Sequence, residues 1–127
     1  MSDFLGIDTS NYTTSAAIYE SSHNVLLQEK MLLPVKKGEK GIRQSDAVFH
    51  HTVQLPEIID NLFTKTGKRD ISAVGVSYAP RRLEGSYMPC FLTGISAATA
   101  VSRALSVPLY RFSHQEGHIA AGLFFPR

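Results

Sequence analysis

The chain has 127 residues, of which 43% are hydrophobic and 19% are charged, and its formal net charge is +2. This length suits one domain that buries its own core, and the composition excludes intrinsic disorder. The weak positive charge neither requires nor excludes a nucleic-acid partner.

A single cysteine, Cys90, excludes an internal disulfide and favours a reducing compartment. Its apolar neighbours predict that it is buried in the core and is not a nucleophile. No apolar run approaches the ~20 residues of a membrane span, and the N-terminus lacks the pattern of a signal peptide. We therefore expect a cytoplasmic protein without a membrane association.

Three apolar segments predict an antiparallel meander at the start of the chain. They cover Phe4 to Ile7, Ser15 to Glu20 and Asn24 to Leu33, with polar turns between them. Residues 34–45 carry lysines and glycines without an apolar period, which predicts a surface loop.

A helical pattern follows this loop. The helix is expected to begin near Asp46, with Ser45 or Asp46 as its N-cap, and to end at Gly67. Pro56 lies inside it and predicts a kink or a broken start. The apolar positions that carry the helical period are Val48, Leu55, Ile59 and Leu62.

The second half of the chain alternates strands and helices. Ala73 to Tyr78 predicts a buried parallel strand, and Pro108 to Phe112 predicts another. Between them, residues 90–105 carry small side chains on every face, which predicts a helix packed tightly on both sides. A last helix is expected to open at residues 114–118. The order βββαβαβα is that of an α/β ribonuclease-H-like layer with a mixed five-stranded sheet.

The sequence "HQEGH" places His114 and His118 four residues apart, on one face of the expected helix. They could bind one cation, although two histidines fall at this spacing by chance often enough that spacing alone is a weak signal. A zinc protease of the HExxH type is excluded, because Glu116 points to the opposite side of the helix. A metal centre would also need a third ligand from elsewhere.

Three stretches in this order carry a family resemblance: "LGIDTSNYTTSAAI", "HHTVQLPEII", and the segment from "AVGVSYAP" to "HQEGHIAAG". Together they resemble the amino-terminal half of the Gcp/TsaD family, which comprises tRNA threonylcarbamoyladenosine transferases once described as O-sialoglycoprotein endopeptidases. The resemblance implies the two-lobed actin-like ATPase (ASKHA) fold. Residues 1–127 would form the N-terminal lobe as a single domain, with the second lobe beyond Arg127.

The resemblance also implies a site. His114 and His118 match the family histidines that bind iron or zinc together with an aspartate of the second lobe. The turn after the first strand resembles the hairpin that approaches phosphates in actin-like folds, although an ordinary turn explains the same residues. In the family interpretation Asp8 is catalytic and orients water or metal. Thr9, Ser10 and Asn11 would face an adenine nucleotide or threonylcarbamoyl adenylate.

The implied reaction transfers a threonylcarbamoyl group to N6 of an adenosine in tRNA. The implied partners are tRNA, TsaB-like and TsaE-like proteins, with a possible homodimer through the helices at 46–66 and 89–105. The alternative is a non-catalytic TsaB-like module of the same fold, although such proteins generally lack the histidine pair. A sugar or acetate kinase of the superfamily would share the hairpin but would not explain HxxxH.

Two features leave their roles open. His51 matches a family histidine on the first helix, and it is either functional or part of the core. Arg81 and Arg82 stand where many family members carry a "GPG" loop. Such a charged loop is more often solvated than bound to an anion, and the difference indicates a divergent paralogue.

Overall fold

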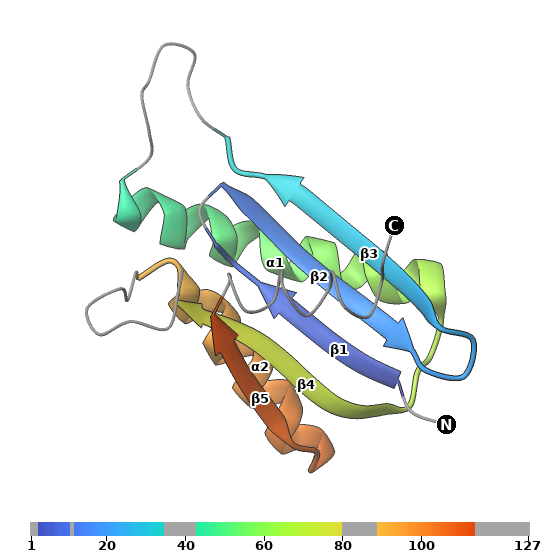
Figure 1. Ribbon diagram of the computed structural model, residues 1–127. Coiled ribbons are helices and arrows are strands. Elements are labelled where there is room, and N and C mark those ends of the chain that lie inside the picture. The colour runs from blue at the N-terminus through green and yellow to red at the C-terminus, as the bar shows by residue number, and fades with distance from the viewer. Residues whose placement is uncertain (1–2, 11, 35–42, 80–88, 114–127) are drawn as a thin grey trace.

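The computed structural model describes residues 3–10, 12–34, 43–79 and 89–113 (Figure 1). Strand β2 is antiparallel to β1 and β3, and β4 is parallel to β1 and β5, giving a sheet of order β3-β2-β1-β4-β5. This confirms the predicted α/β class and mixed five-stranded sheet. The last predicted helix lies outside the described residues. The elements are β1 (Asp3–Asp8), β2 (Thr13–Glu20), β3 (Val25–Leu32), α1 (Gln44–Thr66), β4 (Ile71–Ala79), α2 (Phe91–Leu105) and β5 (Leu109–Ser113).

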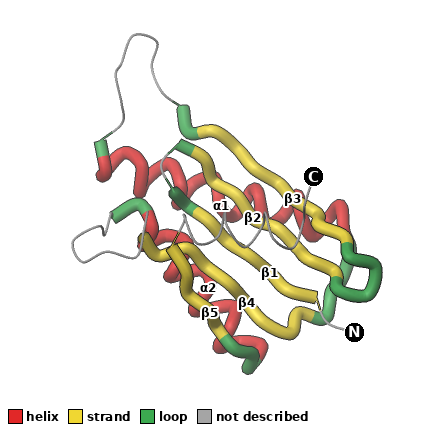
Figure 2. Tube along the Cα trace, viewed as in Figure 1, coloured by secondary structure: helices red, strands yellow, loops and turns green. Residues whose placement is uncertain are grey.

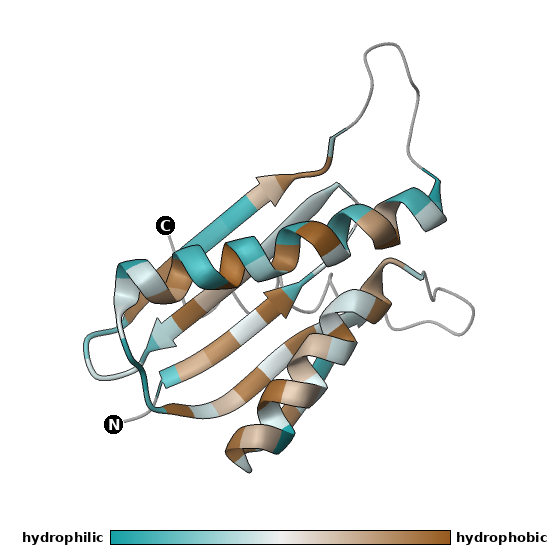
Figure 3. Cartoon of the chain, turned by 180° about the vertical axis from the view of Figure 1, so that it is seen from behind, coloured by the Kyte–Doolittle hydropathy of each residue, from teal (hydrophilic) through white to brown (hydrophobic). Residues whose placement is uncertain are grey.

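Both helices cover the same face of the sheet (Figures 2 and 3). Helix α1 lies against β2 and β3, and α2 lies mainly against β4. Alternation along β1 places Leu5 and Ile7 under the helices. Neither helix in the described ranges is long and apolar enough to cross a membrane. The main core consists of Leu5, Ile7, Ala16, Ile18, Leu55, Ile58, Leu62, Ile71, Val74, Val76 and Ala98.

The two ends of α1 differ in how well the sequence predicted them. The helix begins at Gln44, after Arg43 as N-cap and without a side-chain capping bond, so the predicted caps at Ser45 and Asp46 were wrong. Asp46 lies in the first turn, where its negative charge interacts favourably with the positive end of the helix dipole. The predicted end is confirmed: Gly67 has φ 79°, and its N–H donates to the carbonyl of Phe63 at 2.7 Å.

Helix α1 runs without a break through Pro56, so the predicted broken start was wrong. The ring removes the helical donor to the carbonyl of Thr52, four residues earlier. Both residues lie on the exposed side of the helix. Water can supply the missing donor there, which is why the helix continues.

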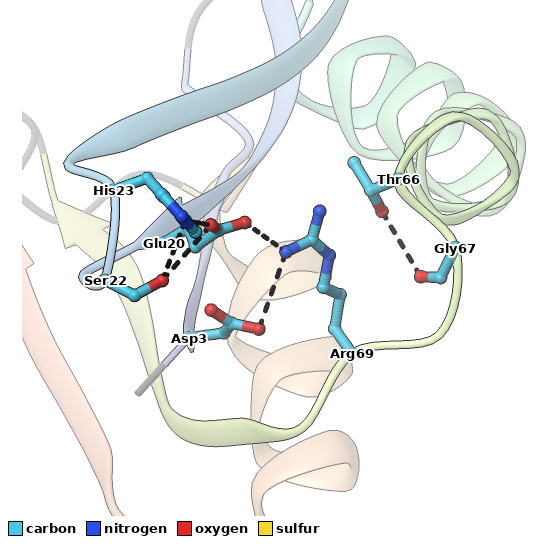
Figure 4. Close-up of polar contacts among 7 residues, drawn as sticks. All are labelled: Asp3, Glu20, Ser22, His23, Thr66, Gly67 and Arg69. Carbon is cyan, nitrogen blue, oxygen red and sulfur yellow. Dashed lines mark hydrogen bonds and ion pairs between the residues drawn. The ribbon is translucent and has the colours of Figure 1, made fainter. Parts of the chain in front are cut away.

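A polar cluster joins the beginning of β1, the end of β2 and the segment between α1 and β4 (Figure 4). The Arg69 guanidinium donates to the Glu20 carboxylate and lies 3.8 Å from that of Asp3. The second Glu20 oxygen contacts His23 and accepts a bond from the Ser22 hydroxyl at 3.2 Å. Chiefly through Arg69 and then His23, this cluster lowers the pKa of Glu20 from 4.5 to about 2.

Candidate functional site

The carboxyl ends of the parallel strands β1 and β4 lie at one edge of the sheet. Asp8 is the last residue of β1 and lies beside Ser77 of β4. Its Oδ1 atom accepts bonds from the Ser77 hydroxyl at 2.7 Å and from the Ser10 N–H at 2.9 Å. Open α/β sheets bind ligands outside the carboxyl ends of their strands. The predicted turn therefore lies where this class of sheet carries its sites.

Sequence reasoning missed Ser77, which is fully buried and donates to Asp8. Its hydroxyl holds the carboxylate in one orientation at the end of β1. A signal was present, because Ser77 is a polar residue in a mostly apolar strand, and a buried hydroxyl needs a partner. The sequence did not indicate which residue that partner was.

The hydroxyl of Thr9 is directed at α2. It donates to the Cys90 carbonyl at 2.9 Å and accepts from the Gly94 N–H at 3.1 Å, and the residue is fully buried. These two groups are separated by four residues in the first turn of α2, so the hydroxyl bridges a helical donor and acceptor. A nucleotide contact by Thr9 would therefore fall to its main chain. Ser10 is buried, and Asn11 lies outside the described residues. Their predicted contacts with a nucleotide stay predictions.

Gly94 allows α2 to approach the sheet this closely. A Cβ atom at this position would lie 3.0 Å from Thr9 Oγ1 and 3.4 Å from the side chains of Ile7 and Val76. Any larger residue would push α2 away from β1 and β4. Gly94 and Thr9 together attach the turn after β1 to the beginning of α2.

Cys90 is buried, as predicted, and packs with Phe91, Leu33 and Ala47. Its N–H donates to the Gln44 side-chain oxygen at 3.3 Å, which links the beginnings of the two helices. Cys90 is thus a structural residue beneath the site.

His51 is a core histidine. It is fully buried, and its Nδ1 atom lies 2.7 Å from the Thr14 hydroxyl oxygen. That oxygen also accepts a bond from the Gln54 amide at 3.1 Å. The Thr14 hydroxyl therefore lies between the His51 imidazole and the Gln54 amide. These three residues join α1 to β2.

The described residues contain no group of three or more His, Cys, Asp or Glu side chains placed to hold a metal. His114 and His118, the predicted metal ligands, lie outside those residues, as do Arg81 and Arg82. Strand β5 runs parallel to β4 and ends at the buried Ser113. The last residue of β5 therefore lies at the edge of the sheet that carries Asp8.

Comparison with known proteins identifies the family. The family model for TsaD, tRNA N6-adenosine threonylcarbamoyltransferase, matches residues 23–127. The chain belongs to the TsaD family. This match includes the "HQEGH" sequence and confirms the resemblance drawn from the ordered motifs.

Two curated relatives carry the name tRNA N6-adenosine threonylcarbamoyltransferase. The protein of Carboxydothermus hydrogenoformans is 31% identical over 92% of this chain and 34% of its own length. That of Bacillus subtilis is 32% identical over 92% of this chain and 33% of its own length. The chain therefore spans about a third of the length of these TsaD relatives.

Among solved structures, YeaZ from Pseudomonas aeruginosa matches with a TM-score of 0.63 and 18% identity. The match covers 89% of this chain and 43% of that protein. At this identity the likeness shows the fold alone, and it confirms the ASKHA-like class implied by the TsaD resemblance.

Proposed function

We propose that this chain is the N-terminal lobe of a cytoplasmic enzyme that transfers a threonylcarbamoyl group to N6 of an adenosine in tRNA. The observation that carries the proposal is the TsaD family match over residues 23–127. The position of Asp8 at the carboxyl edge of the sheet supports it, because β5 ends at the same edge, one residue before the "HQEGH" sequence. The second lobe would lie beyond Arg127, since the relatives are about three times as long.

In this proposal His114 and His118 hold iron or zinc, with a third ligand from the second lobe. The bound metal would act as a Lewis acid on phosphate or carbamoyl oxygens. Asp8 would orient water or the metal, since the Ser10 N–H and the Ser77 hydroxyl hold its carboxylate. The main chain of the turn after β1, with Asn11, would face the phosphate of an adenine nucleotide or threonylcarbamoyl adenylate.

The test begins by sequencing the reading frame past the codon for Arg127 and expressing the protein at its native length. Transfer of labelled threonylcarbamoyl from the adenylate to unmodified tRNA is then measured. We expect Asp8→Asn to lower the rate at least about tenfold, as loss of a supporting group around a metal commonly does. The matched control is Asp60→Asn, which neutralises an exposed carboxylate on α1. Equal rates in the two variants would refute the role of Asp8.

The metal assignment has its own test. His114→Ala combined with His118→Ala is expected to remove stoichiometric iron or zinc, measured by elemental analysis of the purified native-length protein. The control is the double variant His23→Ala and His50→Ala, two described histidines outside the proposed site. Retention of metal by the first variant would refute the assignment.

A second candidate is favoured by the surface between the helices. Helices α1 and α2 enclose an apolar groove, and the hydroxyls of Thr52 and Thr93 lie 3.0 Å apart within it. Leu92 in its lining is 48% exposed, and Phe49 and Val53 on α1 are exposed by 61% and 56%. We infer that this surface pairs with a TsaB-like chain, whether the present chain is catalytic or is itself the non-catalytic member. The groove is lined by Thr52, Leu55, Pro56, Ile59, Leu92, Thr93, Ser96, Ala97 and Ala100.

The small residues on the outer side of α2 support this pairing. Ala97 and Ala100 line the groove, and the helix is apolar or neutral along most of its length (Figure 3). The sequence predicted tight packing on both sides of α2. Within the described residues the chain buries one side of this helix, which carries Gly94 and Ala98. A partner helix would complete the other side. The TsaE-like partner rests on the family resemblance alone.

A further inference from the structure

A polar hollow of about 540 Å³ lies where α2 ends and β5 begins. It is at the opposite end of β5 from Ser113, and therefore away from the edge that carries Asp8. None of the described residues that line it is acidic. They are Thr99, Ser102, Arg103, Ser106, Val107, Pro108, Leu109 and Arg111.

The hollow has two arginines from different elements. Arg103 lies in the last turn of α2, Arg111 lies on β5, and both are exposed. Within the described part of the chain, neither guanidinium forms an ion pair with a carboxylate, whereas Arg69 and Lys65 do. Two positive charges without acidic neighbours therefore border one depression in the surface.

The turn between α2 and β5 is held by its own hydrogen bonds. Ser106 has left-handed backbone angles, φ 56° and ψ 44°, and its N–H donates to the Arg103 carbonyl at 3.2 Å. The Val107 N–H donates to the Ser102 carbonyl at 3.0 Å, and the Ser102 hydroxyl donates back to the Val107 carbonyl at 2.8 Å. These bonds satisfy the Ser102 and Arg103 carbonyls in the last turn of α2. The C-terminal end of a helix disfavours an anion, so the two guanidiniums must outweigh that effect. The two guanidiniums and the Ser106 hydroxyl are left to face a ligand.

We propose that this hollow binds a backbone phosphate of an RNA strand. The planar guanidinium matches phosphate oxygens with two parallel N–H donors, and serine hydroxyls commonly complete such contacts. The choice of RNA rests on the proposed function, whose acceptor is tRNA. The five residues of β5 span about 17 Å, so a strand of a few nucleotides reaches from the hollow to the edge that carries Asp8.

The residue beside Arg111 favours RNA over a free phosphate ion. Tyr110 is 61% exposed on the edge strand, on the opposite face of the sheet from Arg111. An RNA strand that passes around this edge would place a base on its ring while a phosphate remains at the hollow. Recognition of single-stranded RNA commonly combines stacking on aromatic rings with phosphate contacts. Free inorganic phosphate shares the phosphate chemistry of the hollow but would make no use of Tyr110.

The test uses the 127-residue chain and a fluorescein-labelled tRNA anticodon stem-loop, with binding followed by fluorescence anisotropy over a range of salt concentrations. Arg103→Gln combined with Arg111→Gln is expected to weaken binding at low salt about tenfold. It should also reduce the slope of log K against log[salt] by about 1 to 2. The matched control, Lys30→Gln with Lys68→Gln, removes two exposed charges from other elements. We expect it to change affinity less than about twofold, since charges away from the contact are screened.

Either of two binding results would overturn the inference. Equal losses of RNA affinity in the two double variants would show that RNA binding depends only on the total charge of the chain. Titration with inorganic phosphate, followed through the NMR amide signals of Ser106 and Arg111, tests whether the ligand of the hollow is free phosphate. Saturable phosphate binding with RNA affinity insensitive to the arginines would assign the hollow to free phosphate. Thermal melting of each variant confirms that it remains folded.

Failure of the proposed function would look different. If the native-length protein transfers no threonylcarbamoyl group, RNA binding that depends on Arg103 and Arg111 would still support the hollow as an RNA site. If transfer proceeds in Arg103→Gln/Arg111→Gln with an unchanged KM for tRNA, the site is overturned and the transferase proposal stands.

Discussion

At the scale of single residues, Thr9 links the turn after β1 to α2. Thr9→Val removes the hydroxyl between the Cys90 carbonyl and the Gly94 N–H. We expect the free energy of unfolding to fall by about 1 to 3 kcal/mol, because a Val methyl occupies the place of the hydroxyl and leaves the buried N–H and C=O without its bonds. Urea unfolding measures the change. The control is Thr64→Val on the exposed side of α1, and an equal loss there would contradict a specific role for Thr9.

Gly94 permits a test of close packing at the same contact. Gly94→Ala raises helix propensity by up to about 1 kcal/mol but adds a Cβ atom 3.0 Å from Thr9 Oγ1. That oxygen is held by its bond to the Gly94 N–H and cannot move away without losing it. Overpacking of about 1 to 3 kcal/mol should therefore outweigh the gain and lower the free energy of unfolding.

Thermal or urea unfolding of Gly94→Ala measures this balance. The control is Ser96→Ala on the exposed side of the same helix, where we expect a change within about 0.5 kcal/mol. A more stable Gly94→Ala variant would show that α2 can shift away from β1 without cost.

At the scale of elements, the Glu20 cluster predicts a pH dependence. The pKa of Glu20 falls from 4.5 to about 2 in the folded chain, first because of Arg69 and then His23. When folding lowers the pKa of a carboxyl group, the ionised group stabilises the fold at pH values above the pKa of the unfolded chain. This stabilisation is lost as the pH falls through the pKa of the folded chain. The stability difference between the native chain and Glu20→Gln should therefore be constant near neutral pH and shrink between pH 4.5 and 2.

Urea unfolding at several pH values from 7 to 2.5 measures that difference. Glu29→Gln is the matched control, because it removes a more exposed carboxylate that pairs with Lys65 at 3.2 Å, outside the Glu20 cluster. If the difference in the free energy of unfolding between the native chain and Glu20→Gln stays unchanged down to pH 2.5, the Glu20 carboxylate does not lose its stabilising effect in this range, and the prediction is wrong.

Elements whose signals are local could be predicted from the sequence. Alternation predicted the strands to within two residues, and Gly67 predicted the end of α1. The start of α1 could not be predicted from capping residues. Its first turn begins where the Ala47 N–H donates to the Arg43 carbonyl, and Gln44 there contacts Cys90 from the other helix.

The candidate site depended on contacts between distant residues. Asp8 was identified from the family resemblance of the turn after the first strand, but its partner Ser77 lies 69 positions away. Thr9 and Gly94 are 85 positions apart, and Thr14 and His51 are 37 apart. No local pattern encodes such pairs, so the sequence identified His51 without showing whether it was part of the core.

At the scale of the whole molecule, three surfaces are separated by the sheet topology. The carboxyl edge carries Asp8, the outer side of the helices carries the apolar groove, and the hollow at Arg103 lies at the other end of α2. The groove and the hollow share no lining residue, so in the proposed assembly a protein partner at the groove would leave the other two surfaces to RNA.

This separation predicts that pairing can be abolished without affecting RNA binding. Val53→Glu combined with Leu92→Glu places two charges on the exposed apolar surface around the groove. Burying them against a partner is costly, so we expect the affinity for a TsaB-like chain to fall by more than about 30-fold, as for loss of a central interface contact. Sedimentation velocity of the chain alone, and of its mixture with that partner, measures the pairing. Leu32→Glu, at a residue 72% exposed on β3, is the control. Failure of the native chain to pair with the partner or with itself at about 100 μM, or equal loss in the control, would refute the groove as the pairing surface.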